Sequence, residues 1–325
     1  MGFLAEIFMK TVCITGASGF IGSHLCERLV EKYKVIGLDN LSQGNLNNLK
    51  NLKNHPNFKF YFCDVEYLRT YCHIIRENKF DVIFHLAANS DISVSDPNIE
   101  HNHTFETTYE LLEYARLNGV KEFLFASSGS IYGEAYKKTD KPIDEDFGAL
   151  MPISHYAAAK LASEAFISSY SFNYDISSWI FRFPNIIGEH ATHGVIIDFI
   201  NKIKANPDEL EVLGDGSQTK PYLYVKDLID AMLFIWENAD EPLNYYNISG
   251  IGTTSVAEIA RMAIAEMGTK TKIRYTGGDR GWKSDSPKYT PDTKKLTDLG
   301  WIPNMTSNEA VSYSIKQILK ELNYA

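Results

Sequence analysis

The sequence predicts an α/β protein in which a doubly wound parallel sheet carries a smaller C-terminal α/β lobe. Three observations support this fold class. Strand patterns alternate with helical patterns through the first half of the chain, as in a parallel sheet covered on both faces. A glycine-rich turn, Gly16-Ala-Ser-Gly19-Phe-Ile-Gly22, joins the first strand to the first helix. After Pro184 the regular alternation loosens, as expected where a second lobe begins.

The elements of the first half follow from short apolar runs and from the helical spacing of apolar residues in longer segments. Gly119 is expected to end one of these helices, because glycine readily adopts the left-handed backbone that closes a helix. Strands each followed by a helix make a Rossmann-type domain. In chain order we expect strands at 11–15, 34–38, 59–63, 81–86, 122–126 and 176–183, and helices at 20–31, 67–77, 106–117 and 155–170.

The second half contains fewer regular patterns. Helical spacing covers residues 225–238 and 256–267. The segments 189–194, 213–221 and 276–291 are rich in glycine and polar turn residues, so we expect loops there.

The chain is therefore expected to divide into two parts that exchange segments. Residues 9–184, with part of 222–250, are assigned to the Rossmann-type domain. Residues 185–221 and 251–325 are assigned to the smaller lobe. A chain of 325 residues is long enough for one large domain with such an appended lobe.

Composition argues against several classes of protein. The net charge of −9 disfavours nucleic acid or an anionic membrane as the main partner. No apolar run reaches the roughly 20 residues of a membrane span, and residues 1–8 lack the basic region of a secretory signal. The cysteines fit no zinc pattern, so we expect a cytoplasmic protein without metal whose thiols stay free. The four cysteines are Cys13, Cys26, Cys63 and Cys72.

The glycine-rich turn predicts a dinucleotide site. Gly16 permits the tight turn, Gly19 lets the backbone approach a diphosphate, and Gly22 allows the helix to pack closely on the sheet. The diphosphate then lies against the N–H groups of the helix N-terminus. Because this pattern follows a predicted strand and opens a predicted helix, we favour a nucleotide site over an ordinary glycine-rich turn.

Two acidic residues at strand ends bear on the choice of cofactor. Asp39 ends the second strand, where a carboxylate accepts hydrogen bonds from the adenosine ribose and repels a 2′-phosphate. This favours NAD over NADP. Asp64 ends the third strand, where its carboxylate either binds the adenine amino group or caps the segment that starts near Glu66.

Tyr156 and Lys160 form a candidate catalytic pair. They lie four residues apart in a predicted helix and so share one face. A lysine ammonium beside the phenol, together with the positive charge of a nicotinamide, favours the phenolate and makes Tyr156 a base. The alternative is a surface pair without function.

A serine-rich turn supports the catalytic interpretation. Ser127-Ser128-Gly-Ser-Ile-Tyr-Gly133 follows a predicted strand, at the sheet edge where open α/β proteins bind ligands. A serine hydroxyl there can hydrogen-bond the reacting oxygen of a substrate and relay its proton to Tyr156. The alternative is a polar turn.

Together these motifs resemble the extended short-chain dehydrogenase/reductase family, in particular its nucleotide-sugar epimerases and dehydratases. The resemblance covers nearly the whole chain. The motifs that carry it, in chain order, are Gly16-x-x-Gly19-x-x-Gly22, Leu38-Asp39-Asn40, His85-Leu-Ala-Ala88, Ser127-Ser128 through Tyr132-Gly133, Tyr156-x-x-x-Lys160, Arg182-Phe-Pro-Asn185, Gly214-Asp-Gly216 and Tyr224-Val-x-Asp227.

The resemblance implies NAD as cofactor, a nucleotide-diphosphate sugar as substrate, and a role for each matching residue. Ser128, Tyr156 and Lys160 correspond to the catalytic residues. The implied cofactor-binding residues are Gly16, Gly19, Phe20, Ile21, Gly22, Asp39, Asn40, Asp64, Val65, Leu86, Ala87, Ala88, Tyr156, Lys160 and Phe183. The implied substrate-binding residues are Asn89, Ser90, Ser128, Ser130, Asn185, Val195, Lys220, Tyr222 and Arg280.

The sequence departs from the family pattern at several positions. Gly129 and Ser130 stand where 4,6-dehydratases carry the Asp-Glu pair that removes water. Lys220-Pro221 stands where the family has an Arg-Asp pair. Lysine cannot bind a phosphate through two parallel hydrogen bonds as arginine does, so we expect Arg280 to supply that contact with the diphosphate. Thr104 stands where an asparagine near the cofactor is common.

The loop at 189–194 also looks specialised, because it carries His190 and His193. We expect these histidines to make hydrogen bonds with the loop or the substrate rather than to bind a metal.

These observations favour hydride transfer at the sugar C4, of the 4-epimerase type. A 4-dehydrogenase or ketoreductase of a hexose or heptose is the first alternative, a 4,6-dehydratase a weaker one, and a non-enzymatic NAD-binding protein the weakest.

The resemblance further implies a homodimer built from helices near 100–117 and 155–170. The second helix has a stripe of small apolar residues that either meets a partner subunit or faces its own sheet. The stripe consists of Ala158, Leu161, Ala162 and Ala165.

Overall fold

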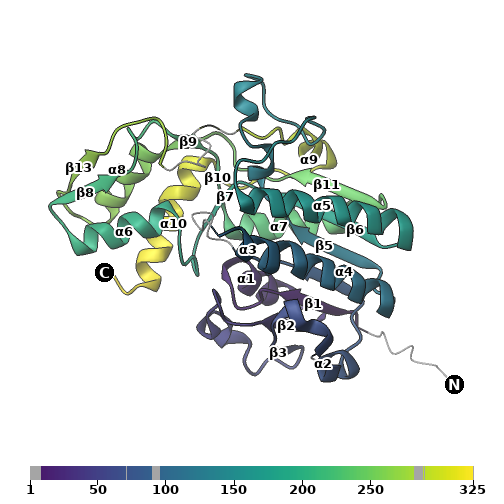
Figure 1. The fold of residues 1–325 in the computed structure, drawn as a ribbon. Helices are drawn as coiled ribbons and strands as arrows, with labels where there is room; N and C mark the ends of the chain where they lie inside the picture. Colours follow the sequence, from purple (N-terminus) through teal and green to yellow (C-terminus); the bar gives the residue numbers. More distant parts are fainter. Residues whose placement is uncertain (1–8, 71, 90–95, 282–287, 289, 325) are drawn as a thin grey trace.

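A computed structural model describes residues 9–70, 72–89, 96–281, 288 and 290–324. Its main feature is a sheet of seven parallel strands (Figure 1). The strand order reverses beside β1, which pairs with β2 on one side and with β4 on the other. Across the sheet the strands are β11 (Leu243–Asn247), β6 (Ser177–Arg182), β5 (Glu122–Ala126), β4 (Val82–His85), β1 (Thr11–Thr15), β2 (Lys34–Asp39) and β3 (Phe58–Phe62).

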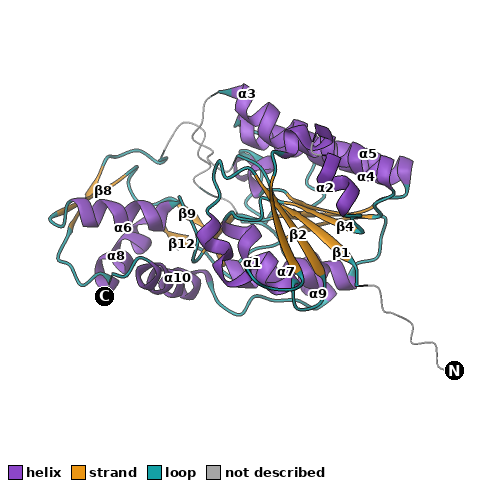
Figure 2. Cartoon of the chain, turned by 90° about the horizontal axis from the view of Figure 1, so that it is seen from below, coloured by secondary structure: helices purple, strands orange, loops and turns teal. Residues whose placement is uncertain are grey.

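Helices cover both faces of this sheet, as Figure 2 shows. One face is covered by α1 (Phe20–Leu29), α7 (Val225–Asn238) and α9 (Lys294–Leu299). The other is covered by α2 (Cys72–Glu77), α4 (Thr107–Asn118) and α5 (His155–Tyr174). Because both faces are covered, the central strands are buried on both sides and read as apolar runs. The expected Rossmann-type fold is confirmed.

A smaller α/β lobe packs beside the carboxyl ends of the strands (Figures 1 and 2). It has its own apolar core around Phe199, Ile259 and Ile315. Its helices are α6 (Val195–Ala205), α8 (Val256–Glu266) and α10 (Ser307–Glu321), and its strands are β7 (Asn185–Ile187), β8 (Glu209–Val212), β9 (Thr219–Lys220), β10 (Tyr222–Tyr224), β12 (Thr254–Ser255) and β13 (Lys272–Tyr275). Between these segments the chain returns to the large sheet through α7 and β11.

Several predicted elements are confirmed residue for residue, namely the strands β1 and β5 and the helix α7. Gly119 ends α4 in the left-handed conformation, with φ +73°. The helix expected at 67–77 is wrong in part, because residues Val65–Thr70 form a 3₁₀ helix and α2 begins only at Cys72. The amphipathic helices α6 and α10 were not predicted. Both lie in the lobe, where their apolar faces meet segments distant in sequence.

The helix expected at 106–117 is longer than predicted and is not uniform. It begins as α3 (Pro97–Glu100), continues as a π-helical turn, η3 (His101–Glu106), and becomes α4. Asp96 caps its start by accepting a hydrogen bond from the backbone of Asn98. π-helical turns are frequent at functional sites, and this one packs against α5.

A buried ion pair fixes α5 to the sheet. Glu164 on α5 and Arg182 at the end of β6 are joined by hydrogen bonds of 2.7–3.2 Å, with side chains 5% and 9% exposed. Arg182 also donates to the hydroxyl of Tyr132 and to the carbonyl of Glu145, and Ser127 donates to Glu164. A guanidinium and a carboxylate buried with this many partners hold each other in one geometry.

Among the described residues, none of the helices combines the length and apolar character that crossing a membrane requires.

We expect Arg182→Leu to lower the free energy of unfolding by about 3–5 kcal/mol, because it leaves the Glu164 carboxylate buried without its cation. Urea unfolding followed by circular dichroism measures this loss. Arg274→Leu is the matched control, because Arg274 is half exposed and pairs with Glu209 and Glu211 at the surface, where ion pairs contribute little. Equal unfolding midpoints for the two variants would contradict the role given to Arg182.

Candidate active site

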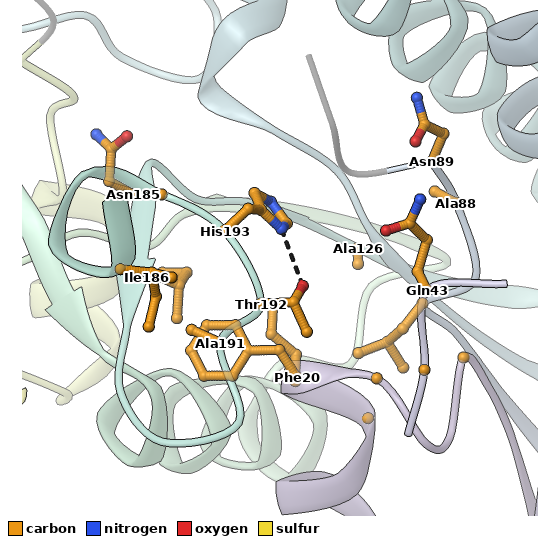
Figure 3. A pocket seen from close by; sticks show the side chains of 18 of the residues that line it. Phe20, Gln43, Ala88, Asn89, Ala126, Asn185, Ile186, Ala191, Thr192 and His193 are labelled. Carbon is orange, nitrogen blue, oxygen red and sulfur yellow. Dashed lines mark hydrogen bonds between the residues drawn. The ribbon is translucent and has the colours of Figure 1, made fainter. Parts of the chain in front are cut away.

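A cavity of about 1020 Å³ lies at the carboxyl ends of the strands. Its floor is where β1 meets β4 and the strand order reverses, the place where doubly wound sheets bind ligands. Its other wall belongs to the lobe, from β7 to the start of α6. Figure 3 shows Asn89 and Gln43 on one side of the cavity and Asn185 on the other, with His193 between them. The volume is at the upper end of the roughly 300–1,000 Å³ that is typical of ligand pockets.

All residues expected to bind the cofactor line this cavity, from Gly16 in the first turn to Phe183 after β6. The glycine-rich turn shows why glycine is needed. Gly16 has φ +70°, and a β-carbon there would lie 2.9 Å from the backbone nitrogen of Ala87. A β-carbon on Gly22 would overlap the carbonyl oxygen of Gly16. The first turn of α1 has no side-chain cap, so its N–H groups can receive a diphosphate.

Asp39 lies at the carboxyl end of β2 and lines the cavity. Its carboxylate accepts hydrogen bonds from the backbone N–H groups of Ser18 (2.9 Å) and Leu41 (2.8 Å). These bonds hold the charge next to the glycine-rich turn, where an adenosine ribose would lie. A carboxylate there accepts from two ribose hydroxyls and repels a phosphate.

Asp64 makes the capping hydrogen bond of one expected role and lies where the other role would require it. It accepts a hydrogen bond from the backbone of Glu66 (3.2 Å), so it caps the following 3₁₀ helix, and it also lines the cavity. Its second oxygen accepts from the side chain of Asn40 (3.0 Å). The two interpretations are therefore compatible, because a carboxylate has enough lone pairs for a cap and a ligand.

Tyr156 and Lys160 lie on one face of α5, which Ser154 caps. The ammonium of Lys160 donates a 2.7 Å hydrogen bond to the carbonyl of Ala126 at the end of β5. It lies 5.7 Å from the ring centre of Tyr156. The sheet thus fixes the lysine, and the lysine faces the phenol along the wall of the cavity.

The electrostatics of this pair differ from the expectation. Burial raises the pKa of Tyr156 to about 12, although a hydrogen bond with Ser128 acts to lower it. Burial also lowers the pKa of Lys160 to about 7, against the opposing charges of Glu100 and Glu164. The protein groups alone therefore disfavour the phenolate, because desolvation outweighs the hydrogen bond with Ser128. The positive nicotinamide ring of NAD⁺, when bound, would add a charge that favours the phenolate.

Ser128 lies beside the pair, just after β5. It accepts hydrogen bonds from the backbone N–H (3.2 Å) and the hydroxyl (2.9 Å) of Ser130, so it caps the short helix η4 (Gly129–Tyr132). It also interacts with the phenol of Tyr156. The turn is polar and capped, as the polar-turn interpretation predicts. Its serine also contacts the candidate base, as the catalytic interpretation predicts.

The residues expected to bind substrate are only partly brought together. Those that line the cavity are Asn89, Asn185, Val195, Lys220 and Tyr222. Ser128, Ser130 and Arg280 do not line it. The guanidinium of Arg280 donates to Glu134 (2.7 Å) and Tyr136 (3.2 Å) instead. Ser90 lies outside the described residues.

The two histidines of the 189–194 loop differ in position. His193 lines the cavity beside Thr192, whose hydroxyl lies 3.2 Å from its ring (Figure 3). His190 points away, stacks on His24 of α1 at 4.7 Å and hydrogen-bonds the hydroxyl of Ser23. Over the described part of the chain, no three side chains of metal-binding type cluster.

Sequence reasoning missed several residues of the site. Ile99, His103 and Thr107 reach the cavity from the segment that carries the π-helical turn. Glu100, from the same segment, is buried close enough to Tyr156 and Lys160 to act on the pKa of both. The sequence predicts that a glutamate in an amphipathic segment is exposed to solvent, so only the structure reveals that Glu100 is buried.

Fold and site together define a dinucleotide-dependent oxidoreductase of the short-chain dehydrogenase type. The chain matches the NAD dependent epimerase/dehydratase family over residues 12–249, and it belongs to that family. It is 32% identical over 322 residues to a UDP-glucose 4-epimerase of Mycolicibacterium smegmatis, covering 95% of this chain and 98% of the relative. It is 29% identical over 331 residues to a human dTDP-D-glucose 4,6-dehydratase, covering 95% and 90%. Among solved structures it resembles a UDP-galactose 4-epimerase with a TM-score of 0.84 and 35% identity, over 96% of this chain and 99% of the other.

Family membership and the cavity agree on NAD as the cofactor. We expect Asp39→Ala to weaken NAD⁺ binding by about 10–100-fold, the loss of hydrogen bonds to a charged group. NADP⁺ should weaken less or gain, because the repulsive charge is gone. Calorimetric titration with both nucleotides measures this. Asp64→Ala is the control, expected to weaken both nucleotides alike. Tighter binding of NADP⁺ than of NAD⁺ by the unmodified protein would refute the role of Asp39.

Proposed function

We propose that this enzyme transfers hydride at C4 of a nucleotide-diphosphate sugar, as a 4-epimerase. The observation that carries the proposal is the position of Tyr156 and Lys160 at a single cavity shared by the Rossmann-type domain and the lobe, with Ser128 hydrogen-bonded to the phenol of Tyr156 from behind the cavity lining. Similar proteins are named for 4-epimerisation of UDP-glucose or UDP-galactose, which supports a UDP-sugar as the substrate class.

The protein groups have defined tasks in this reaction. Tyr156 removes the proton of the C4 hydroxyl, and Ser128 holds the same oxygen through its own hydroxyl. Lys160, fixed by the carbonyl of Ala126, stabilises the phenolate. Bound NAD⁺ supplies a hydride acceptor and later a donor. Turning the 4-keto sugar before the hydride returns gives the epimer, and releasing it gives a 4-dehydrogenase or, in reverse, a ketoreductase.

The lobe, which comprises residues 185–224 and most of 251–324 but not α9, is proposed to hold the nucleotide and the sugar. Asn185 and Lys220 line its side of the cavity. The start of α6 also lines it, and that helix has no side-chain cap. Uncapped N–H groups and a lysine suit a diphosphate.

The proposal disfavours 4,6-dehydration, although dehydratases are among the relatives. Gly129 and Ser130 offer no acid or base at the positions where dehydratases use them. Glu134 is the nearest carboxylate after the serine-rich turn, and it is held by Arg280 and Lys137 at 2.7 Å each. A carboxylate neutralised by two cations is a poor proton donor. Asp91, which the sequence also suggests for this role, lies outside the described residues.

Incubation with UDP-glucose or UDP-galactose in D₂O is expected to give an epimer or a 4-keto sugar that keeps its C6 oxygen and gains no deuterium at C6. Mass spectrometry and NMR measure both. Tyr156→Phe should lower turnover by about 10²–10⁴-fold, the contribution of one positioned acid–base group, while retaining NAD⁺ binding. A product lighter by one water with a deuterated C6 methyl would contradict the proposal and identify the enzyme as a 4,6-dehydratase.

We also propose a homodimer through α4 and α5. The stripe of Ala158, Leu161, Ala162 and Ala165 does not face the protein's own sheet, since all four are exposed or half-buried. Phe172 on the same helix is 77% exposed. Phe166 is 40% exposed and packs on Phe105 of η3 at 5.2 Å. Exposed aromatic and small residues on adjacent helices are typical of a contact surface.

Light scattering at micromolar concentration is expected to give twice the chain mass. Phe172→Asp should yield monomers, because it places a charge in the apolar interface. Phe62→Asp is the control, since Phe62 is also largely exposed (60%) but lies on the edge strand β3. A monomeric unmodified protein would contradict the dimer.

A cytoplasmic location is part of the proposal. Cys13, Cys26 and Cys63 are buried and free, and burial raises the pKa of each thiol. Unpaired thiols are typical of proteins in a reducing compartment.

A further inference from the structure

Glu100 is a buried carboxylate that the proposed reaction does not use. It is 1% exposed and ends α3, directly before the π-helical turn. Two neutral groups donate to it, the side-chain amide of Asn89 (2.7 Å) and the hydroxyl of Thr104 (3.0 Å). Burying a carboxylate is costly unless an opposite charge compensates, and neutral donors supply only part of that compensation.

The hydrogen bonds of Glu100 lead toward the floor of the cavity. Asn89 lines the cavity itself. The carbonyl of Thr104 accepts from the hydroxyl of Thr108 (2.7 Å), which in turn bonds the ring of His85 (3.1 Å). His85 bonds the hydroxyl of Thr15 at the end of β1 (2.8 Å). The carboxylate is thus held by a buried polar network that begins at the glycine-rich turn.

The segment that carries this carboxylate packs against the catalytic helix. α3 and η3 both pack against α5, and the charge of Glu100 acts on Tyr156 and on Lys160 across that contact. The arrangement places one carboxylate, one phenol and one ammonium in the same buried region.

The other charged groups around the pair are already accounted for. Glu164 of α5 is bound by Arg182. His85 of β4 is held neutral, since burial lowers its pKa well below the usual value, with Lys160 adding to that shift. His103 of η3 is exposed and lies 3.8 Å from Glu66 of η2. Glu110 of α4 is also buried, but it is not among the charges that act on either group. Glu100 is the carboxylate that acts on both members of the pair.

We propose that Glu100 is a positioning residue of the active site, the buried counter-charge of the Tyr156–Lys160 pair. It keeps Lys160 an ammonium despite burial, and it makes the phenolate of Tyr156 a stronger base once the proton has left. The inference rests on the proposed function, because it assigns Glu100 to the acid–base pair of that reaction.

The direction of the effect follows from the sign of the charge. Burial is the main cause of both pKa shifts, and the negative charge of Glu100 raises the pKa of Tyr156 and of Lys160. Removing the charge should lower both values. Both limbs of a bell-shaped pH profile should then move to lower pH.

The test is a titration of Tyr156 with NAD⁺ bound, followed by NMR of protein labelled at the tyrosine Cζ. The chain has 19 tyrosines, so Tyr156→Phe assigns the resonance. We expect Glu100→Gln to lower the pKa of Tyr156 by about one unit. Glu106→Gln makes the same change of charge at a half-buried position of η3 that does not line the cavity, and it should leave the pKa unchanged.

Two further variants keep the test decisive. Glu100→Asp retains the charge and should keep a pKa close to that of the unmodified protein, whereas Glu100→Leu removes the charge at similar volume and should repeat the shift of Glu100→Gln. An unchanged pKa in folded Glu100→Gln overturns the proposal, and so does failure of both neutral variants to fold, which would show a purely structural role. The titration needs no turnover, so absence of activity on any nucleotide sugar would refute the proposed function without deciding the role of Glu100.

Discussion

The active site depends on the ion pair between Glu164 and Arg182. Glu164 lies one helical turn after Lys160 on α5, and Arg182 ends β6. The same guanidinium bonds Tyr132 at the end of the serine-rich turn, and the same carboxylate accepts from Ser127 beside the catalytic serine. One buried interaction therefore fixes both the helix that carries the candidate base and the turn that carries the serine. Because each partner would be costly to bury alone, the helix cannot shift along the sheet without breaking the pair.

Burial has opposite effects on the pKa values of Tyr156 and Lys160. It disfavours the charged form of each, so Tyr156 keeps its proton more strongly and Lys160 less strongly than in water. In such a site the phenol of Tyr156 stays protonated until a further positive charge binds beside it. A cofactor that brings this charge then activates the base only when it is bound, so that the acid–base chemistry is coupled to occupancy of the dinucleotide site.

Local patterns predicted much of the fold and part of the site. The glycine-rich turn, Asp39 at a strand end and the Tyr156–Lys160 spacing are short-range features, and each can be read because its neighbours in sequence are also its neighbours in space. The helices α6 and α10 were missed because their apolar faces are completed by distant segments. The π-helical turn was missed for a similar reason. Its extra residue is stabilised by the hydroxyls of Thr107 and Thr108, which bond the carbonyl of Thr104, and no periodicity reveals such a bond.

The two walls of the cavity differ in how firmly they are built. The sheet provides a fixed floor, because β1 and β4 are buried on both faces and tightly paired. The opposite wall comes from β7, the 189–194 loop and α6, which are short elements joined by glycines in left-handed conformations, Gly188 at φ +149° and Gly194 at φ +104°. Substitutions in this wall can change which ligand binds without disturbing the sheet.

His193 lies on that wall (Figure 3), whereas His190 anchors the loop to α1 through His24 and Ser23. The two histidines therefore have different roles in the loop. His193 faces the cavity, and His190 fixes the loop to α1, the helix that follows the glycine-rich turn.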